Sequence, residues 1–219
     1  NSLAAVDPAF GGKGRVTGAL EGQFVAPSGR FDVQASNLSW AADNQVYRLA
    51  NLSAKAEMGK GLDGILHINS SLRGLVSPQV RLDQASLNVQ GTRPQHNLVL
   101  SAKNSTFTLE GRAAGRWKDG VGWAGQILQL SNRGLHAFAL TAPVTLEIAR
   151  QRVVLGSARV DLAGADLALH DLTYNAGQMT SSGEFKRLPL AYLNRLAADT
   201  EQIDTNLTLT GNWQIAVGD

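Results

Sequence analysis

The sequence contains no cysteine, which excludes disulfide bridges and thiolate metal sites. It also has little excess charge of either sign, with 20 Lys and Arg residues against 18 Asp and Glu residues. A net charge of +2 without long basic runs argues against nucleic acid or an anionic membrane surface as a partner. No stretch approaches the roughly 18 consecutive apolar residues that a membrane-spanning helix needs.

The chain opens on Asn1 and Ser2, without an initiator methionine or a signal peptide. We therefore expect it to be part of a longer protein whose anchor or signal lies outside this sequence. Any contact with a membrane would then be made through those other parts.

Motifs that would indicate catalysis or nucleotide binding are missing. Two GxGxxG matches occur, beginning at Gly59 and Gly120, but a dinucleotide site needs these glycines between a strand and a helix. The residues after both matches alternate as strands do, so both matches predict turns. Neither GxSxG nor HExxH is present.

The titratable residues form no catalytic or metal-binding constellation. The four histidines are far apart in sequence and are expected to be ordinary surface or rim residues: His67, His96, His136 and His170. No pair of carboxylates has surroundings that would separate the two pKa values, as acid–base catalysis requires. The sequence therefore predicts a protein that is not an enzyme, with no catalytic residue, metal or cofactor.

The tryptophans at positions 40, 117, 123 and 213 allow two interpretations. Trp117 lies between Arg116 and Lys118, as in a stacking platform for single-stranded nucleic acid. The other three have no such basic neighbours, which favours a core or groove-rim position.

Apolar residues alternate with polar or small residues along almost the whole chain. This period of two predicts about a dozen β-strands with one apolar and one polar face, separated by turns rich in Gly, Asn, Asp and Pro. Slips of the alternation before Leu38 and at His170 and Asp171 predict β-bulges, which bend a sheet. A sheet of that many strands must curl, split or close.

One segment departs from this period. Residues 188–198 carry Leu190, Leu193 and Leu196 at helical spacing, with Pro189 near the first turn, and predict one short helix. Such a helix either caps an apolar end of the sheet or contacts a membrane or partner. We expect residues 1–219 to form a single all-β segment.

The strand pattern resembles the TamB family, the translocation and assembly module proteins of the AsmA-like group in Gram-negative bacteria. The resemblance covers residues 14 to 217. Its most specific part is Ser181-Ser182-Gly183 leading to Leu188-Pro189-Leu190. The other stretches that carry it are 82–91, 96–100, 142–146, 153–162 and 172–174.

The resemblance implies a very large protein anchored in the inner membrane, whose β-rich body crosses the periplasm. That body would be a long, curved, open antiparallel sheet, a β-taco or half-pipe with an apolar concave face. The family is implicated in moving phospholipids between the inner and outer membranes, and in outer-membrane protein assembly with the barrel partner TamA. It offers no catalytic residues.

An apolar face along a dozen strands also predicts a binding surface on physical grounds, because large exposed apolar patches usually mark one. We expect phospholipid acyl chains to lie against these residues: Leu66, Ile68, Leu87, Val89, Leu98, Leu100, Phe107, Leu109, Val160, Leu162, Leu207 and Leu209.

Two other functions are open at this point. The final predicted strand, 206–217, has neither proline nor charge and could pair with a strand of a nascent outer-membrane protein. Alternatively, two apolar faces could meet in a closed β-sandwich with a dry core, which would act as a spacer.

Overall fold

The computed structural model describes residues 10–22, 28–42, 45–61, 63–78, 80–118, 122–190, 192 and 205–218. Within these ranges, it confirms the predicted all-β fold, with fifteen strands assigned to one antiparallel sheet. The chain divides into two compact units, Asn1–Thr108 and Leu109–Asp219, which we call the first and the second unit. Within the described residues, no helix has the length and apolar character needed to cross a membrane.

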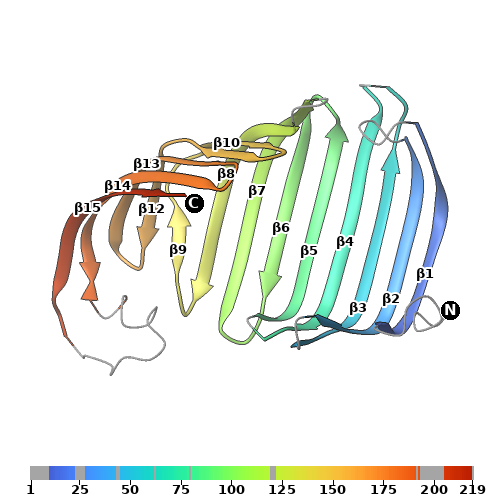
Figure 1. Ribbon diagram of the computed structural model, residues 1–219, viewed down its shortest axis with the longest axis horizontal. Helices are drawn as coiled ribbons and strands as arrows, with labels where there is room; N and C mark the ends of the chain where they lie inside the picture. The colour runs from blue at the N-terminus through green and yellow to red at the C-terminus, as the bar shows by residue number, and fades with distance from the viewer. Residues whose placement is uncertain are drawn as a thin grey trace. The chain divides into compact units, whose positions relative to one another are not determined.

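The first unit is an up-and-down meander in which each strand pairs with the next in sequence (Figure 1). One tight turn lies at residues 92–95, where the Thr92 amide donates to the Gln95 carbonyl at 2.8 Å. Its strands are β1 (Phe10–Glu21), β2 (Ser28–Ala42), β3 (Gln45–Met58), β4 (Ile65–Val76), β5 (Arg81–Thr92) and β6 (His96–Lys103).

The second unit follows the same plan with shorter, interrupted strands. Its strands are β7 (Phe107–Lys118), β8 (Gly122–Gly134), β9 (Phe138–Leu140), β10 (Val144–Ala149), β11 (Arg152–Leu155), β12 (Ala158–Leu162), β13 (Ala165–Asn175), β14 (Gln178–Pro189) and β15 (Thr208–Val217). Both β9 and β10 pair with β8, and both β11 and β12 pair with β13. Leu155 opposes Leu172 and Ala158 opposes Leu169, so β11 and β12 lie end to end along β13 in one register.

The predicted slips of alternation are present as irregularities of the strand ladders. In the first unit, Asn37 adopts φ 51° and the β1–β2 register shifts between Gly11 and Lys13. In the second unit, the β13–β14 register shifts between Leu169 and Asp171. Irregularities of this kind bend and twist the strands that contain them.

Two local predictions need correction. The helix expected at 188–198 starts later, because Leu188 and Pro189 are still paired in β14; Leu190 and Tyr192 are helical, and the rest lies outside the described residues. The Asn and Gly of Asn132-Arg133-Gly134 also predict a turn, and this prediction is wrong, because β8 continues to Gly134. The Asn132 side-chain amide donates to the His136 carbonyl at 2.8 Å, which closes the turn after the strand ends.

Few side chains of this fold are completely buried. No large side chain within the described ranges is fully buried. The second unit contains a small cluster of Ala165, Leu188 and Tyr192, against which Leu162 and Phe185 pack. The two faces of the strands are therefore the main feature to examine for function.

Candidate functional site

One face of the first unit is apolar across all six of its strands. Directly opposed residues of neighbouring strands point to the same face of a sheet, so each register pair extends a row of side chains. The central row opposes Ile68 to Val89 and Val89 to Leu98. Its full course is Gly18, Phe31, Ala56, Ile68, Val89 and Leu98, and the row beside it is Val16, Val33, Ala54, Ser70, Leu87 and Leu100.

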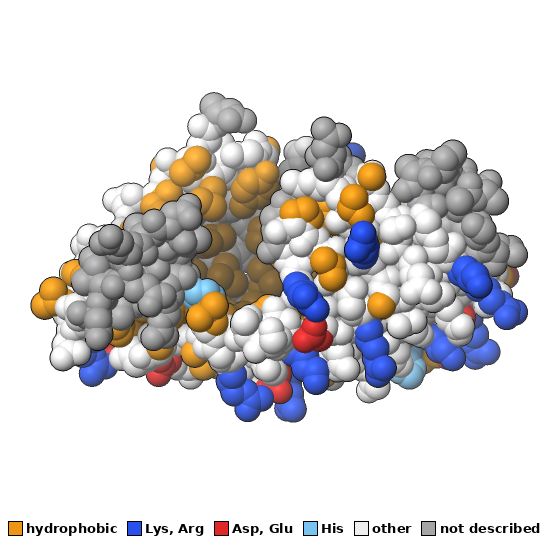
Figure 2. Space-filling model, turned by 90° about the horizontal axis from the view of Figure 1, so that it is seen from below, with side chains coloured by type: hydrophobic (Ala, Val, Ile, Leu, Met, Phe, Trp, Pro, Cys, Tyr) orange, Lys and Arg blue, Asp and Glu red, His pale blue; other side chains and the backbone are white. Residues whose placement is uncertain are grey.

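The opposite face of the same strands is polar. The residues between the apolar rows include Asp32 paired with Lys55, and Asn69 paired with Asn88. In Figure 2, most of the Lys, Arg, Asp and Glu side chains lie along the lower side of the view, apart from most of the hydrophobic side chains. The strands of this unit therefore have two chemically different surfaces.

Burial varies along the apolar face of the first unit. Ala56 and Val89, near the middle strands, are each 5% exposed. In contrast, Val16 on β1 is 72% exposed and Leu100 on β6 is 38% exposed. Exposed apolar side chains in continuous rows, rather than scattered singly, are typical of a surface that binds an apolar ligand or partner.

The second unit has a comparable apolar face. Ile148 on β10 opposes Val153 on β11, which is part of a row of Trp123, Ile148, Val153, Tyr174, Met179 and Val217. Ile148 is 43% exposed and Val217 is 58% exposed. The next row consists of Gly125, Leu146, Leu155, Leu172, Ser181 and Ile215.

The structure places six of the predicted lining residues together on the apolar face of the first unit: Leu66, Ile68, Leu87, Val89, Leu98 and Leu100. In the second unit, Val160 joins a row with Leu140, Leu167 and Phe185. That they line a lipid path is still a prediction.

The remaining predicted residues have different surroundings. Leu162 packs against the buried cluster of the second unit, and Leu209 opposes Leu188 on β14. Leu207 precedes β15 and is 64% exposed, so it belongs to no row. Phe107 and Leu109 are half-buried on β7.

Several residues of the apolar faces were not among those predicted, although they show the same alternation. They belong to strands near the edges and to the interrupted strands of the second unit: Val16, Phe31, Val33, Met58, Trp123, Leu146, Ile148, Val153, Leu155, Leu172, Tyr174 and Phe185. A rule that takes every member of an alternating run would have found them.

The histidines differ in burial, and the buried one stabilises a turn. His67 and His170 are exposed, as expected, but His96 is buried, with 3% of its surface exposed. Its Nδ1 lies 2.9 Å from the Thr92 carbonyl oxygen, so the ring closes the β5–β6 turn. Across the described ranges, no three residues of metal-ligating type are grouped to hold an ion.

One exposed ion pair shifts the pKa values of both its members. The Lys60 ammonium lies 2.9 Å from a Glu21 carboxylate oxygen. Hydrogen bonding to Lys60 lowers the pKa of Glu21, and hydrogen bonding to Glu21 raises the pKa of Lys60. The pair links the end of β1 to the β3–β4 turn and does not belong to either apolar face.

Comparison with known proteins gives a family match. The profile of the family described as "TamB, N-terminal domain" matches residues 1–218. Neither the curated proteins nor the solved structures yielded a match. Because the matched residues make up almost the whole sequence, the chain belongs to the TamB family.

Proposed function

We propose that the apolar faces bind the acyl chains of phospholipids, and that this chain is one segment of a path that carries phospholipids between the inner and outer membranes. The observation that carries the proposal is the pair of rows, apolar except at Ser70, that cross all six strands of the first unit. The family is a non-enzymatic family of the cell envelope, which agrees with a surface that binds without reacting.

The energetics of burial favour acyl chains as the ligand. Each buried methylene gains about 0.8 kcal/mol, so a chain of about sixteen carbons gains on the order of 10 kcal/mol before ordering costs. Val16 and Leu20 are the most exposed residues of the first unit's apolar face. An acyl chain that covers them therefore removes the most apolar surface from water at these two positions.

The repetition of the rows suggests how lipids move. Neighbouring strands present side chains of similar size and polarity, as Val89 and Leu98 do. An acyl chain therefore has similar affinity at successive positions, and the barriers between those positions are low. In this proposal, the chain belongs to the periplasmic part of a protein that is anchored in the inner membrane by other segments.

Native mass spectrometry of the purified chain, with lipid extraction from the same sample, tests this proposal. The matched variants are L100D on the apolar face and V99D on the polar face, since both residues lie on β6 and both are exposed. The proposal expects co-purified phospholipid in the wild type and V99D, and its loss in L100D. A lipid-free wild type that ignores added phospholipid and hydrophobic dye contradicts it and favours a closed spacer.

A second function is favoured by the edge of β15. This strand pairs with β14 and with no other described strand, and its ten residues include no proline and no charge. An uncharged open edge can accept another strand by β-augmentation. We propose as the alternative that this edge pairs with nascent outer-membrane proteins, together with a TamA-like barrel reached through the full-length protein.

A double substitution on the edge strand β15 distinguishes the two proposals. N212K and Q214K place charges on β15 at positions that oppose Glu184 and Ser182 on β14. If assembly is the function, this double variant should bind an unfolded outer-membrane barrel protein more weakly while still co-purifying with phospholipid. Unchanged binding of the barrel protein contradicts the role of this edge.

A further inference from the structure

The polar face of the first unit divides into a neutral half and a basic half. In the neutral half, Arg30 opposes and pairs with Glu57. Beside them, the Lys55 ammonium lies 3.3 Å from an Asp32 oxygen. Every cation in these rows therefore has an acidic partner.

The basic half has no such partners. Its first row consists of Lys13, Ser36, Asn51, Arg73, Gln84 and Lys103, and its second row consists of Arg15, Gln34, Ser53, Ser71, Ser86 and Ser101. These rows contain cations and no carboxylate. Asp83 is the residue before Gln84 on β5, and it does not line the depression described next.

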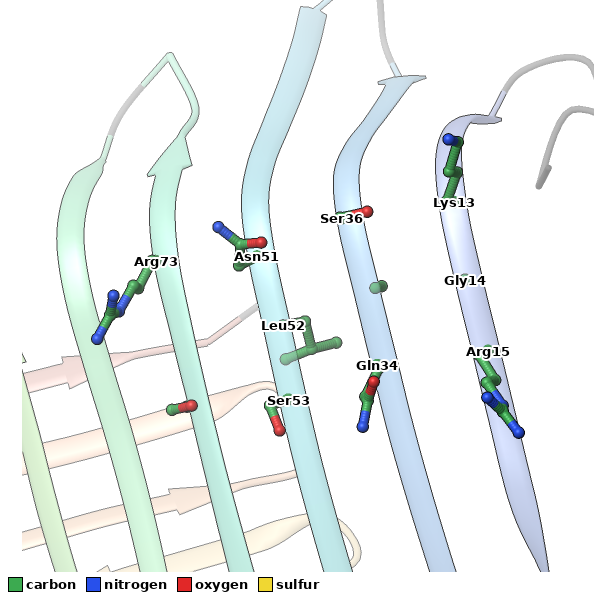
Figure 3. Close-up of a pocket in the computed structure, with 11 residues that line it drawn as sticks. Lys13, Gly14, Arg15, Gln34, Ser36, Asn51, Leu52, Ser53 and Arg73 are labelled. Carbon is green, nitrogen blue, oxygen red and sulfur yellow. The ribbon is translucent and has the colours of Figure 1, made fainter. Parts of the chain in front are cut away.

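An open depression of about 630 Å³ lies over this basic half (Figure 3). Gln34, Asn51 and Ser53 lie on its central strands, while Lys13 and Arg15 project from β1 and Arg73 from β4. None of these three cations makes an ion pair or a side-chain hydrogen bond with another described residue, and all three are exposed. Neutral amide and hydroxyl groups thus lie between unpaired positive charges.

We propose that this depression binds a phosphate group. Guanidinium groups donate paired hydrogen bonds to oxyanions, and a lysine adds a compact charge. A phosphate has several strong acceptor oxygens and carries more charge than a carboxylate, so it can accept hydrogen bonds from groups on several sides at once. The amides of Gln34 and Asn51 and the nearby serine hydroxyls supply the neutral donors.

The phosphate can come from a phospholipid headgroup or from a soluble phosphate. The depression lies on the face opposite the apolar rows, so the proposal does not depend on the binding of acyl chains. It gives the polar face of the first unit a ligand of its own.

Titration of the whole 219-residue chain with inorganic phosphate, at constant ionic strength in an isothermal calorimeter, tests the site. A second arm measures binding to phosphatidylglycerol vesicles, with phosphatidylcholine vesicles as the zwitterionic control. The test variant is K13Q/R15Q/R73Q. The matched control, R30Q/K55Q/K60Q, removes the same charge from ion-paired positions of the same unit.

Phosphate binding that is about tenfold weaker in the test variant and retained in the control supports a site for soluble phosphate. Binding of phosphatidylglycerol vesicles alone, with the same dependence on the variants, supports a headgroup site. Equal loss in both variants, or no binding in either arm, overturns the proposal. Thermal unfolding of both variants verifies that they remain folded.

Discussion

Val99 and Leu100 are neighbours on β6 whose side chains lie on opposite faces of the first unit. Leu100 opposes Leu87, in an apolar row, whereas Val99 opposes Asn88, between polar side chains. Their exposed fractions are similar, 38% for Leu100 and 47% for Val99. These two residues therefore separate the effect of the face from the effect of hydrophobicity alone.

The pairing of Leu87 with Leu100 predicts a simple cross-linking result. The native chain has no cysteine, so two introduced thiols are the only ones present. Directly opposed side chains have Cβ atoms about 5 Å apart, and side chains on opposite faces cannot approach each other. L87C/L100C should cross-link efficiently with a short reagent that carries two maleimide groups, each of which adds one thiol, and L87C/V99C should not. Efficient cross-linking of the second pair would contradict the register.

Truncation of Leu188 should destabilise the second unit. Leu188 is 7% exposed and belongs to the buried cluster with Ala165 and Tyr192. Replacement by alanine removes buried methyl groups and leaves a cavity, which costs about 2–5 kcal/mol of unfolding free energy. Urea unfolding measures this loss. L209A, at the partly exposed partner position on β15, is the control and should cost clearly less.

Gly183 should not tolerate a larger side chain, because the Trp213 indole covers it. A Cβ atom at position 183 would lie 2.3 Å from the indole ring. The same indole donates from Nε1 to the Ser181 hydroxyl at 3.1 Å. G183A should therefore displace the ring, break this hydrogen bond and cost about 1–3 kcal/mol. Tryptophan fluorescence and urea unfolding measure both effects, and an unchanged spectrum with unchanged stability would refute this packing.

The Glu21–Lys60 pair should make a pH-dependent contribution to stability. The pKa of Glu21 is lowered from 4.5, so its contribution is present above that pH and is lost as the pH falls. The pKa of Lys60 is raised from 10.5, so its contribution is present below that pH and is lost as the pH rises. NMR titration should show the pKa of Glu21 returning to its ordinary value in K60M. The effect on overall stability should be small because both side chains are exposed.

The fold could be predicted from the sequence because alternation with a period of two is a local signal. The slip at His170 and Asp171 was also visible, since Leu169 and Leu172 cannot share a face without an irregular residue between them. The basic half of the polar face was not predicted. Lys13 and Arg73 are sixty positions apart in sequence, and only the register of four strands puts them in one row.

The helix start and the buried histidine were missed for a different reason. Proline is common in the first turn of helices, yet Pro189 ends strand β14. There it pairs with Thr208 of the next strand, a contact that the local sequence around Pro189 does not show. His96 is buried because the turn places its ring against the Thr92 carbonyl. Both positions are fixed by contacts that the hydrophobic period does not encode.

The most direct test of the central claim is photo-cross-linking in growing cells. A photoreactive phenylalanine analogue is introduced at Leu100 in one variant and at Val99 in the other, and adducts are identified by mass spectrometry after irradiation. The apolar face binds acyl chains in our account, so phospholipid adducts should form at position 100 and be absent or rare at position 99. Equal labelling at both positions, or no lipid adduct at position 100, would contradict it.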